Sequence, residues 1–361
     1  MRIEMRRSMR ISYEKLHRYC VQIFEKYGFS GEDSQLTADV LLQADLFGIE
    51  SHGISRIRKY IDLLDEGIIQ VDAKPEIIRE TPLSAVIDVH SAIGQPQAVK
   101  AMQIAIKKAK EHGIGMVQLR GGNHYGIAGY YALLAAREGL LGISMTNTAA
   151  IMVPTFSAQA LLGSNPIAFA MPKADGIPFL YDGATTVITR GKVELYDREK
   201  KTLKEGWTVG TSGKIETDPG TVLNEIRQKS GGILPVGGAG ETYAGYKGFG
   251  YAMMCEIMTS VLSGGVSAIH KKERGDTSQC FYAIDYGMFG DKAETEKRMQ
   301  QLADDIHSAA KADGCSRIYI AGEKEFDKEK ENRRLGISIS EKSYLNLCEA
   351  GKHLGIPKLQ C

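Results

Sequence analysis

The sequence of 361 residues lacks the short motifs that identify common nucleotide-binding and hydrolytic enzymes. Gly-x-Gly pairs begin at Gly113, Gly238 and Gly248, but none has the third glycine of Gly-x-Gly-x-x-Gly, the loop that lets a backbone approach a pyrophosphate. The phosphate-loop, His-Glu-x-x-His and Gly-x-Ser-x-Gly motifs are absent as well. A Rossmann fold, a P-loop enzyme and a hydrolase with a nucleophile elbow are therefore disfavoured.

Excess charge of one sign and closely spaced cysteines are lacking too. Lys plus Arg number 45 and Asp plus Glu 44, which leaves a formal charge of +1 and no overall field to attract nucleic acid or an anionic membrane. The six cysteines lie far apart, with no Cys-x-x-Cys pair and no histidine at zinc-ligand spacing, so we expect neither disulfides nor a metal site. A small-molecule partner is the better expectation.

No apolar run is long enough to span a membrane, which takes about 20 residues. The longest candidate, residues 251–269, is interrupted by Glu256 and by the pair Gly264-Gly265. The basic N-terminal leader is not followed by an apolar segment, so no secretory signal is indicated. We therefore expect a protein of the cytoplasm.

The residues that are present indicate a globular α/β protein. Hydrophobic residues make up 43% and charged residues 25% of the chain, close to the averages of globular proteins. Apolar residues at helical spacing predict three helices near the start, over about residues 12–28, 33–48 and 51–67, each ending at a glycine. Ser51 is the expected N-cap of the third helix.

After Pro75, apolar runs typical of strands alternate with helical patterns. We expect strands over residues 83–89, 115–119, 141–145, 281–285 and 318–321, and helices over residues 97–111, 127–137, 251–262, 292–311 and 341–352. Residues 184–235 indicate loops, short strands and one short helix, and the charge run 323–334 indicates a solvated face or a mobile linker. The expected parts are an N-terminal helical region (1–75), a mixed α/β core (76–290) and C-terminal elements (291–361) that complete the N-terminal lobe.

The first candidate site is Ser51-His52-Gly53, followed by Arg56 and Tyr60. In a helix capped by Ser51, His52, Arg56 and Tyr60 would form one stripe at positions i, i+4 and i+8. Arginine binds a carboxylate through two parallel hydrogen bonds, and histidine exchanges a proton near neutral pH, so the stripe suits an oxo acid. A solvated helix face can have the same composition, and that alternative stays open on these residues alone.

The second candidate is the segment Arg120-Gly121-Gly122-Asn123-His124-Tyr125-Gly126, between an expected strand and an expected helix. Its glycines allow a tight turn, and ligands collect in such strand-to-helix turns. His124 would then point into a cleft, although a lone histidine in a turn is as often structural.

Further glycine-rich turns supply small hydroxyl, amide and carboxylate groups, at residues 146–148, 163–166, 182–186 and 245–250. Such groups can bind the amide and ribose of a nucleotide, and Lys247, just before a helical pattern, can meet phosphate. Taken singly, each turn has a composition that ordinary turns share.

Together these motifs resemble one family, the malate/L-lactate dehydrogenases that are distinct from the Rossmann-type enzymes of the same names. That family also contains ureidoglycolate dehydrogenase, diketogulonate reductase, sulfolactate dehydrogenase and cyclic-imine reductases. The resemblance covers nearly the whole chain and rests on Ser51-His52-Gly53, Asn123-His124-Tyr125-Gly126, Gly163-Ser164-Asn165-Pro166 and Lys247-Gly248-Phe249-Gly250. It implies a mixed-sheet, non-Rossmann NAD(P)-binding fold, sulfolactate dehydrogenase-like, with an N-terminal helical region.

The resemblance also implies roles for single residues. His124 would be the general acid/base that protonates the carbonyl oxygen, although some members are assigned the histidine that is His52 here. Arg56 would hold the substrate carboxylate and Tyr60 would assist. The residues that would bind NAD or NADP are Thr148, Asp182, Gly183, Ala184, Thr185, Lys247, Arg333 and Gly336. The family resemblance further implies a homodimer.

The chain departs from the family pattern near its C-terminus. Family members usually have Arg-x-Pro-Gly-Glu, whereas this chain has Arg333-Arg334-Leu335-Gly336-Ile337, without the proline and the glutamate. The loop that would contact the cofactor therefore differs in this chain.

The sequence thus predicts an NAD(P)-dependent oxidoreductase that moves a hydride between nicotinamide and C2 of a small 2-oxo or 2-hydroxy acid, with malate and lactate equally open. Two alternatives remain, namely reduction of the C=N bond of a cyclic imino acid and a nucleotide-binding module without turnover. A hydrolase that uses His124 is disfavoured because no serine or cysteine nucleophile stands in a recognisable elbow.

Overall fold

The computed structural model describes residues 8–272 and 274–360; most of the basic leader and Cys361 lie outside them. The first two helices, α1 (Tyr13–Lys26) and α2 (Gly31–Leu46), confirm the helical spacing. Each begins at a serine whose hydroxyl accepts a hydrogen bond from the backbone N–H three residues on, Ser12 for α1 and Ser30 for α2. Gly28 ends the first helical region in the left-handed conformation, with φ +97°.

The predicted third helix starts later than expected, and Ser51 does not cap it. Two 3-10 turns, η1 (Glu50–His52) and η2 (Ile54–Arg56), precede α3 (Ile57–Asp65). The cause is the buried Asp45 of α2, whose Oδ2 accepts a hydrogen bond of 2.8 Å from the Ile54 N–H. A Cβ atom on Gly53 would lie 2.0 Å from Asp45 Oδ1, so this close approach requires glycine. The expected single helical stripe of His52, Arg56 and Tyr60 is therefore wrong.

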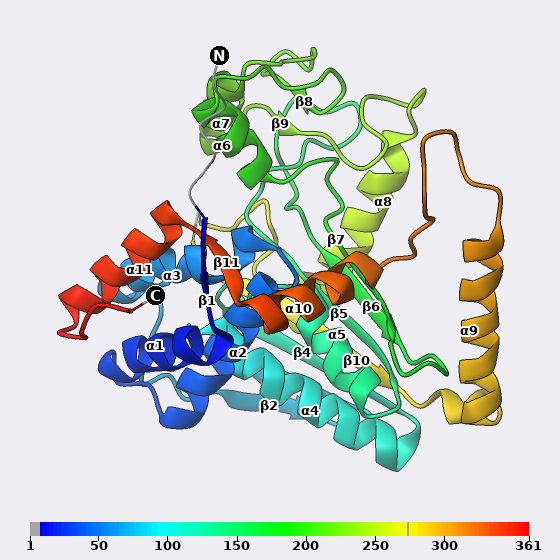
Figure 1. The fold of residues 1–361 in the computed structure, drawn as a ribbon. Helices are drawn as coiled ribbons and strands as arrows, with labels where there is room; N and C mark the ends of the chain where they lie inside the picture. Colours follow the sequence, from blue (N-terminus) through cyan, green and yellow to red (C-terminus); the bar gives the residue numbers. More distant parts are fainter. Residues whose placement is uncertain (1–7, 273, 361) are drawn as a thin grey trace.

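The centre of the molecule is a seven-stranded mixed sheet, in the order β2-β3-β4-β10-β5-β6-β7 (Figure 1). Only β3 and β4 are parallel, and every other neighbouring pair in this sheet is antiparallel. The strands are β2 (Glu76–Glu80), β3 (Ser84–Asp88), β4 (Ile114–Gly122), β5 (Leu141–Thr146), β6 (Ile167–Met171), β7 (Phe179–Gly183) and β10 (Thr277–Ile284). This topology confirms a mixed, non-Rossmann α/β fold.

Helices α4 (Gly94–His112) and α5 (Ala128–Arg137) pack closely on this sheet. Two strand glycines make the approach possible, because a Cβ on Gly115 would lie 1.9 Å from the Ala105 carbonyl oxygen and one on Gly142 would lie 2.2 Å from that of Ala132. The shared core is rich in alanine. This packing fixes the start of α4 and the turn between β4 and α5 against each other.

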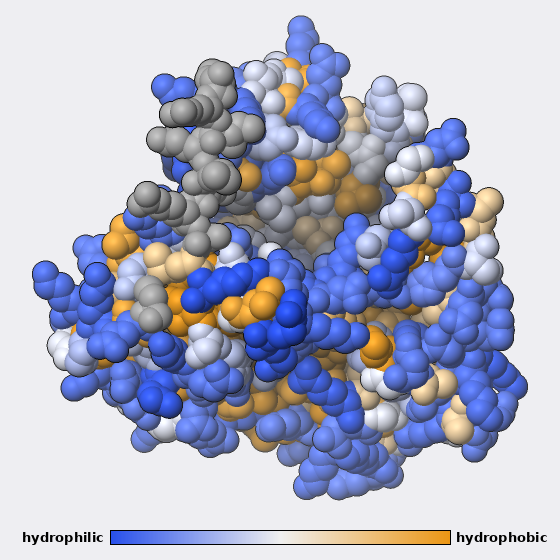
Figure 2. Space-filling view, in the orientation of Figure 1, coloured by the Kyte–Doolittle hydropathy of each residue, from blue (hydrophilic) through white to orange (hydrophobic). Residues whose placement is uncertain are grey.

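Residues 184–235 form a lobe at the top of Figure 1 that has two helices, not the single short helix expected. They are α6 (Arg190–Arg198) and α7 (Pro219–Gln228), accompanied by the two-residue strands β8 (Thr208–Val209) and β9 (Gly232–Ile233). The lobe has its own apolar cluster. Figure 2 shows a hollow between this lobe and the body below, with apolar side chains in its depth.

The two terminal regions of the described chain pack together beside α2. Strand β1 (Ser8–Ile11) pairs antiparallel with β11 (Ile337–Ser340), which is flanked by α10 (Glu323–Leu335) and α11 (Glu341–His353). Residues 323–334, the charge run, thus form a solvated helix, which confirms one of the two expectations. The predicted strand at residues 318–321 is wrong, because this exposed segment is irregular and only the Leu180 N–H to Ala321 carbonyl bond joins it to β7.

The remaining elements are α8 (Gly245–Glu256), a π-helical turn η3 (Ile257–Val261), η4 (Tyr286–Phe289) and α9 (Lys292–Ser308). Helix α9 stands apart at the right edge of Figure 1. Among the described residues no helix is both long and apolar enough to cross a bilayer. The predicted division into three parts and the cytoplasmic location stay predictions.

Candidate active site

His124 lies in the turn between β4 and α5, as the sequence predicted. Asn123 fixes this turn, because its Nδ2 donates to the Ser91 and Ala92 carbonyl oxygens at 2.9 and 3.1 Å. Gly126 has φ +87°, and a Cβ there would lie 2.6 Å from Val40 Cγ1. The backbone on both sides of His124 is therefore held, which presents its half-buried ring in one orientation.

Two other predicted site residues, Tyr60 and His52, contact the His124 ring from separate elements. The Tyr60 hydroxyl of α3 lies 2.7 Å from His124 Nδ1. The His52 ring of η1 stacks on the His124 ring, with centroids 5.4 Å apart and an angle of 27° between the planes. The structure thus brings together both candidate proton donors and Tyr60, even though the helical stripe that suggested two of them does not exist.

Both histidines are neutral at physiological pH. Burial, followed by the charge of Arg56, holds the pKa of His124 well below its usual value. The same two causes lower the pKa of His52 to about 3. A neutral imidazole in such a place can donate a hydrogen bond to a carbonyl oxygen or accept a proton from a hydroxyl group.

Cationic groups surround the histidine pair. Arg56 donates from Nε to the Ser51 carbonyl oxygen at 2.6 Å, and within residues 8–272 and 274–360 no carboxylate pairs with its guanidinium. Lys59, one turn further along, is exposed to solvent at its surface, and the protein around it, followed by the charges of Arg56 and Arg190, lowers its pKa. Arg190 of α6 forms an ion pair with Glu194 at 3.1 Å, so the cations that suit an anionic substrate here are Arg56 and Lys59.

Beyond the histidines lies a buried polar chain that the sequence did not predict. Glu256, at the end of α8, accepts hydrogen bonds from Asn147 Nδ2 at 3.1 Å and Asn165 Nδ2 at 2.8 Å. Lys271 donates from Nζ to Asn147 Oδ1 and Thr277 Oγ1, both at 3.2 Å. Burial lowers the pKa of Lys271 to about 8. An ammonium and a carboxylate, each 4% exposed, are thus connected through one amide.

Several residues predicted to bind the cofactor cluster on the neighbouring strands. Thr148 Oγ1 accepts from the Ser164 N–H at 2.9 Å, and both the N–H and the hydroxyl of Thr185 donate to the Ser164 carbonyl oxygen. Asp182 accepts from the Gly129 N–H at the start of α5 at 2.7 Å. Asp182 is exposed at the surface. Protein atoms surround its carboxyl group nevertheless, and this partial desolvation raises its pKa to about 6. Gly183 and Ala184 follow it at the end of β7.

Three other residues predicted to bind the cofactor, Lys247, Arg333 and Gly336, do not belong to this cluster. Lys247 is exposed in the first turn of α8, a helix that begins without a side-chain cap. Arg333 is paired with Glu329 of α10 and covers the Tyr13 ring at 5.4 Å. Gly336 ends α10 against the backbone of Ile11. The structure therefore places Arg333 and Gly336 against α1 and β1, whereas His124 lies at the end of β4, and their predicted roles stay predictions.

Sequence reasoning missed four residues of this region, namely Gln95, Glu256, Lys59 and Lys271. Gln95 is 0% exposed at the start of α4, yet neither of its amide atoms has a hydrogen bond of standard geometry within the described residues. The helical spacing of Lys59 relative to Arg56 was a signal that could have been used. For Glu256 and Lys271 the sequence carries no such signal, because only burial makes a glutamate or lysine unusual.

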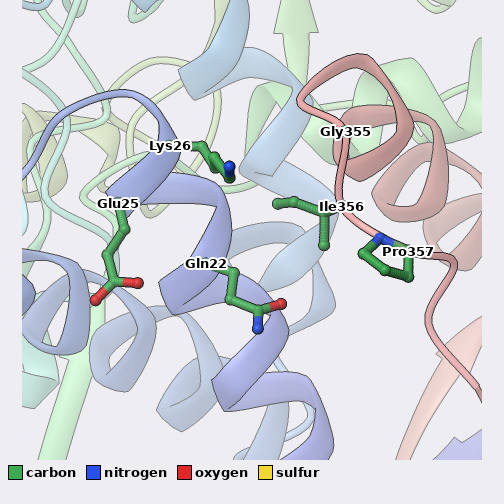
Figure 3. Close-up of a pocket in the computed structure, with 6 residues that line it drawn as sticks. All are labelled: Gln22, Glu25, Lys26, Gly355, Ile356 and Pro357. Carbon is green, nitrogen blue, oxygen red and sulfur yellow. The ribbon is translucent and has the colours of Figure 1, made fainter.

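A different pocket lies outside this region. Figure 3 shows it between the end of α1 and the segment after α11, lined by Gln22, Glu25, Lys26, Gly355, Ile356 and Pro357. No predicted site residue lines it, and it offers no histidine or arginine. The convergence of side chains around His124, rather than this pocket, marks the candidate active site.

The sequence is similar to one family of known proteins along most of its length. The profile of the malate/L-lactate dehydrogenase family matches residues 11–348. This chain belongs to that family. It is 40% identical to the malate dehydrogenase of Pyrococcus horikoshii over 355 residues, which cover 97% of each chain. It is 38% identical to the L-sulfolactate dehydrogenase of Methanocaldococcus jannaschii over 341 residues, 93% of this chain and 94% of the relative.

A solved structure agrees. The crystal structure of malate dehydrogenase from Entamoeba histolytica superposes with a TM-score of 0.93 at 34% sequence identity, covering 97% of this chain and 99% of that one. The chain is accordingly an oxidoreductase of the 2-hydroxy acid dehydrogenase type, as the sequence predicted. Membership of a dehydrogenase family implies a nicotinamide cofactor.

Proposed function

We propose that this family member transfers a hydride reversibly between a nicotinamide dinucleotide and C2 of malate or a closely similar 2-hydroxy dianion. The observation that carries the proposal is the pairing of a neutral His124 with an arginine that lacks a carboxylate partner. Within residues 8–272 and 274–360, no protein group hydrogen-bonds to His124 Nε2. A substrate carboxylate on Arg56 would place the carbonyl oxygen near this nitrogen, and His124 would protonate it as charge develops there.

The preference for a dianion rests on the second cation. Lys59 lies one helical turn from Arg56, and no carboxylate in the described part of the chain forms an ion pair with it. The positive charges of Arg56 and Lys59 repel each other, and a second anionic group on the substrate would reduce this repulsion. Malate has two carboxylates, which is consistent with the malate and sulfolactate dehydrogenases among the relatives.

The nicotinamide cofactor, NAD or NADP, would bind at the turns that carry Thr148, Asp182 and Thr185 and at the start of α8. A Cβ on Gly163 would lie 2.2 Å from Thr148 Oγ1, so only glycine lets this turn pack against Thr148, whose hydroxyl lies beside that of Ser164. Asp182 and Thr185 would supply further polar contacts, and Lys247 with the uncapped start of α8 would meet a phosphate. When bound, the cofactor supplies or accepts the hydride at C4 of its nicotinamide ring.

The test is absorbance at 340 nm with purified protein and NADH or NADPH in separate reactions. Oxaloacetate, pyruvate, 2-oxoglutarate and a cyclic imino acid serve as acceptors. The proposal predicts the highest kcat/KM with oxaloacetate. A higher kcat/KM with pyruvate would contradict the preference for a dianion that Lys59 suggests. Turnover of the imino acid alone would show that the reaction is C=N reduction instead.

We further propose that the chain forms a homodimer through the apolar faces of α8–η3 and α9. Of the 17 residues of α9, only Ala303 is buried within the described chain. Leu302 of α9 and Val261 of η3 are more than half exposed, at 53% and 61%, an arrangement that favours a partner surface. Sedimentation should show a dimer, and Leu302→Glu should shift it toward monomer. Leu345→Glu, at an equally exposed leucine of α11, should not.

A further inference from the structure

The Tyr60 hydroxyl faces His124 rather than solvent. Tyr60 is 2% exposed, and its hydroxyl oxygen lies 2.7 Å from His124 Nδ1. A side chain that holds a substrate carboxylate needs an open face, as Arg56 has. The position of Tyr60 behind the histidine ring suits a group that acts on the histidine.

A second hydrogen bond fixes the direction of the first. The Gly126 N–H donates to the same Nδ1 at 3.2 Å, and a backbone N–H can only donate. Nδ1 is therefore an acceptor without a proton, so the Tyr60 hydroxyl also donates to it. Since His124 is neutral, its own proton is on Nε2. This is the nitrogen for which the described residues provide no protein partner.

With this tautomer, His124 can give its Nε2 proton to the substrate only if Nδ1 gains a proton. If Nε2 alone gave its proton to the substrate oxygen, an imidazolate would remain, which is a very unfavourable anion. The requirement is met when Nδ1 takes up a proton at the same moment. Of the two donors on Nδ1, the amide of Gly126 cannot release its proton under these conditions, whereas the phenol of Tyr60 is an ionisable group.

Two neighbours of Tyr60 partly offset the burial that disfavours its phenolate. Helix α4 begins directly against the His124 turn, because a Cβ on Gly94 would lie 2.5 Å from the His124 carbonyl oxygen. The next residue is Gln95, fully buried and without a hydrogen bond of standard geometry, yet its amide faces Tyr60 closely enough to lower the pKa of the phenol. Arg56 also lowers this pKa, while burial, the larger effect, raises it and keeps the resting phenol protonated.

We propose that Tyr60 is the proton reservoir of His124 and that the buried amide of Gln95, which lacks a hydrogen bond of standard geometry within the described chain, stabilises its phenolate. This inference rests on the proposed function, in which His124 protonates the substrate. The hydride, with its two electrons, reduces the C2 carbonyl and the nicotinamide is oxidised. The new C2 oxygen takes the Nε2 proton while Nδ1 takes the Tyr60 proton. Return of that proton to Tyr60, with uptake of one solvent proton at Nε2, restores the starting state.

Other ionisable groups around the pair affect the pH dependence of this step. His52, Arg56 and Lys59 act on His124 from η1, η2 and α3, and Lys271 acts from the segment after η3. Tyr131 of α5 interacts with Tyr60 and has its own pKa raised by burial. Because several groups titrate, a count of the protons in motion is more decisive than a pH profile alone.

The experiment is a proton inventory on single-turnover hydride transfer in mixtures of H₂O and D₂O, followed at 340 nm so that product release does not contribute. The wild-type protein should give a curved plot, since two protons move in the step. Tyr60→Phe should lower the rate by about 10²-fold or more, leave KM nearly unchanged and give a straight plot. An unaltered curve in this variant, or a raised KM with an unchanged rate, would overturn the relay.

Gln95→Met provides an independent measurement, also if Tyr60→Phe does not fold. It keeps the buried volume and removes the amide, so the rate should fall while KM and the melting temperature change little. Gln97→Met, two residues along α4 and partly exposed, is the matched control and should behave as wild type. An unchanged rate in Gln95→Met would refute the role of Gln95. Absence of hydride transfer in the wild type with every acceptor would refute the proposed function itself, a result distinct from an active enzyme without the relay.

Discussion

Replacement of Asp45 by asparagine should change how stability depends on pH. Asp45 is 4% exposed on α2, and its Oδ2 accepts the Ile54 N–H at 2.8 Å. Burial raises its pKa from 3.8 to about 8, against the opposing effect of that hydrogen bond. The carboxyl group that supports the turn around His52 is therefore protonated in the folded protein at neutral pH.

The sign of the effect follows from where the proton is held. Between about pH 4 and pH 8 the folded state keeps a proton on Asp45 that the unfolded chain has released, so the free energy of unfolding falls as pH rises through this range. Each pKa unit corresponds to about 1.4 kcal/mol, so the loss reaches at most about 6 kcal/mol above pH 8. Asparagine keeps an oxygen for the Ile54 N–H and cannot ionise, so Asp45→Asn should lack this loss.

Urea unfolding followed by circular dichroism between pH 5 and pH 9, at one protein concentration, measures the difference. The two proteins should be of similar stability at pH 5, and the variant should be more stable by several kcal/mol at pH 9. Asp62→Asn, at a half-exposed ion pair with Arg58, is the control and should change stability by less than about 1 kcal/mol at either pH. Parallel curves for wild type and Asp45→Asn would refute the reasoning.

Four further variants test the site. His124→Ala should lower kcat by about 10² to 10⁴-fold with little change in nucleotide affinity; full activity would move the proton-donor role to His52. Arg56→Lys should raise KM because the planar fork is lost, and an unchanged KM would remove Arg56 from the substrate site. Gly53→Ala should destabilise the fold by roughly 1–3 kcal/mol by overpacking, measured by thermal unfolding, since its Cβ would lie 2.0 Å from Asp45 Oδ1. Because burial lowers the pKa of Lys271 to about 8, kcat of the wild type should change with pH above pH 8 and that of Lys271→Met should change less; identical profiles would exclude titration of this lysine as the cause.

The sequence predicted elements well where the signal was local. Helices α1 and α2 and the turn at His124 were found because apolar spacing and glycines mark them, although the start of α2 was placed at residue 33 rather than after its cap Ser30. The start of α3 was missed because it is determined by Asp45, which binds the Ile54 N–H from another helix. The strand expected at residues 318–321 was wrong because it too depends on distant segments. An apolar run forms a strand only where it can pair with the edge of a sheet.

The candidate site was predictable in its residue types but not in its geometry. His52, His124 and Tyr60 were all named, and the structure brings them together, but through two 3-10 turns rather than along one helix. Gln95 and Lys271 could not have been named, because what sets them apart is burial, which arises only when distant segments pack.

The end of the chain supports this site from a long way off in the sequence. Asn332 of α10 donates two hydrogen bonds from Nδ2, to the carbonyl oxygens of Asp45 and Leu46 at 3.1 and 3.0 Å, and Asp45 in turn holds the turn that carries His52. During synthesis, a ribosome would have to translate nearly the whole chain before this support exists. These two bonds join residues 287 and 286 positions apart, so a chain that stops short of α10 would lack this support for the turn of His52.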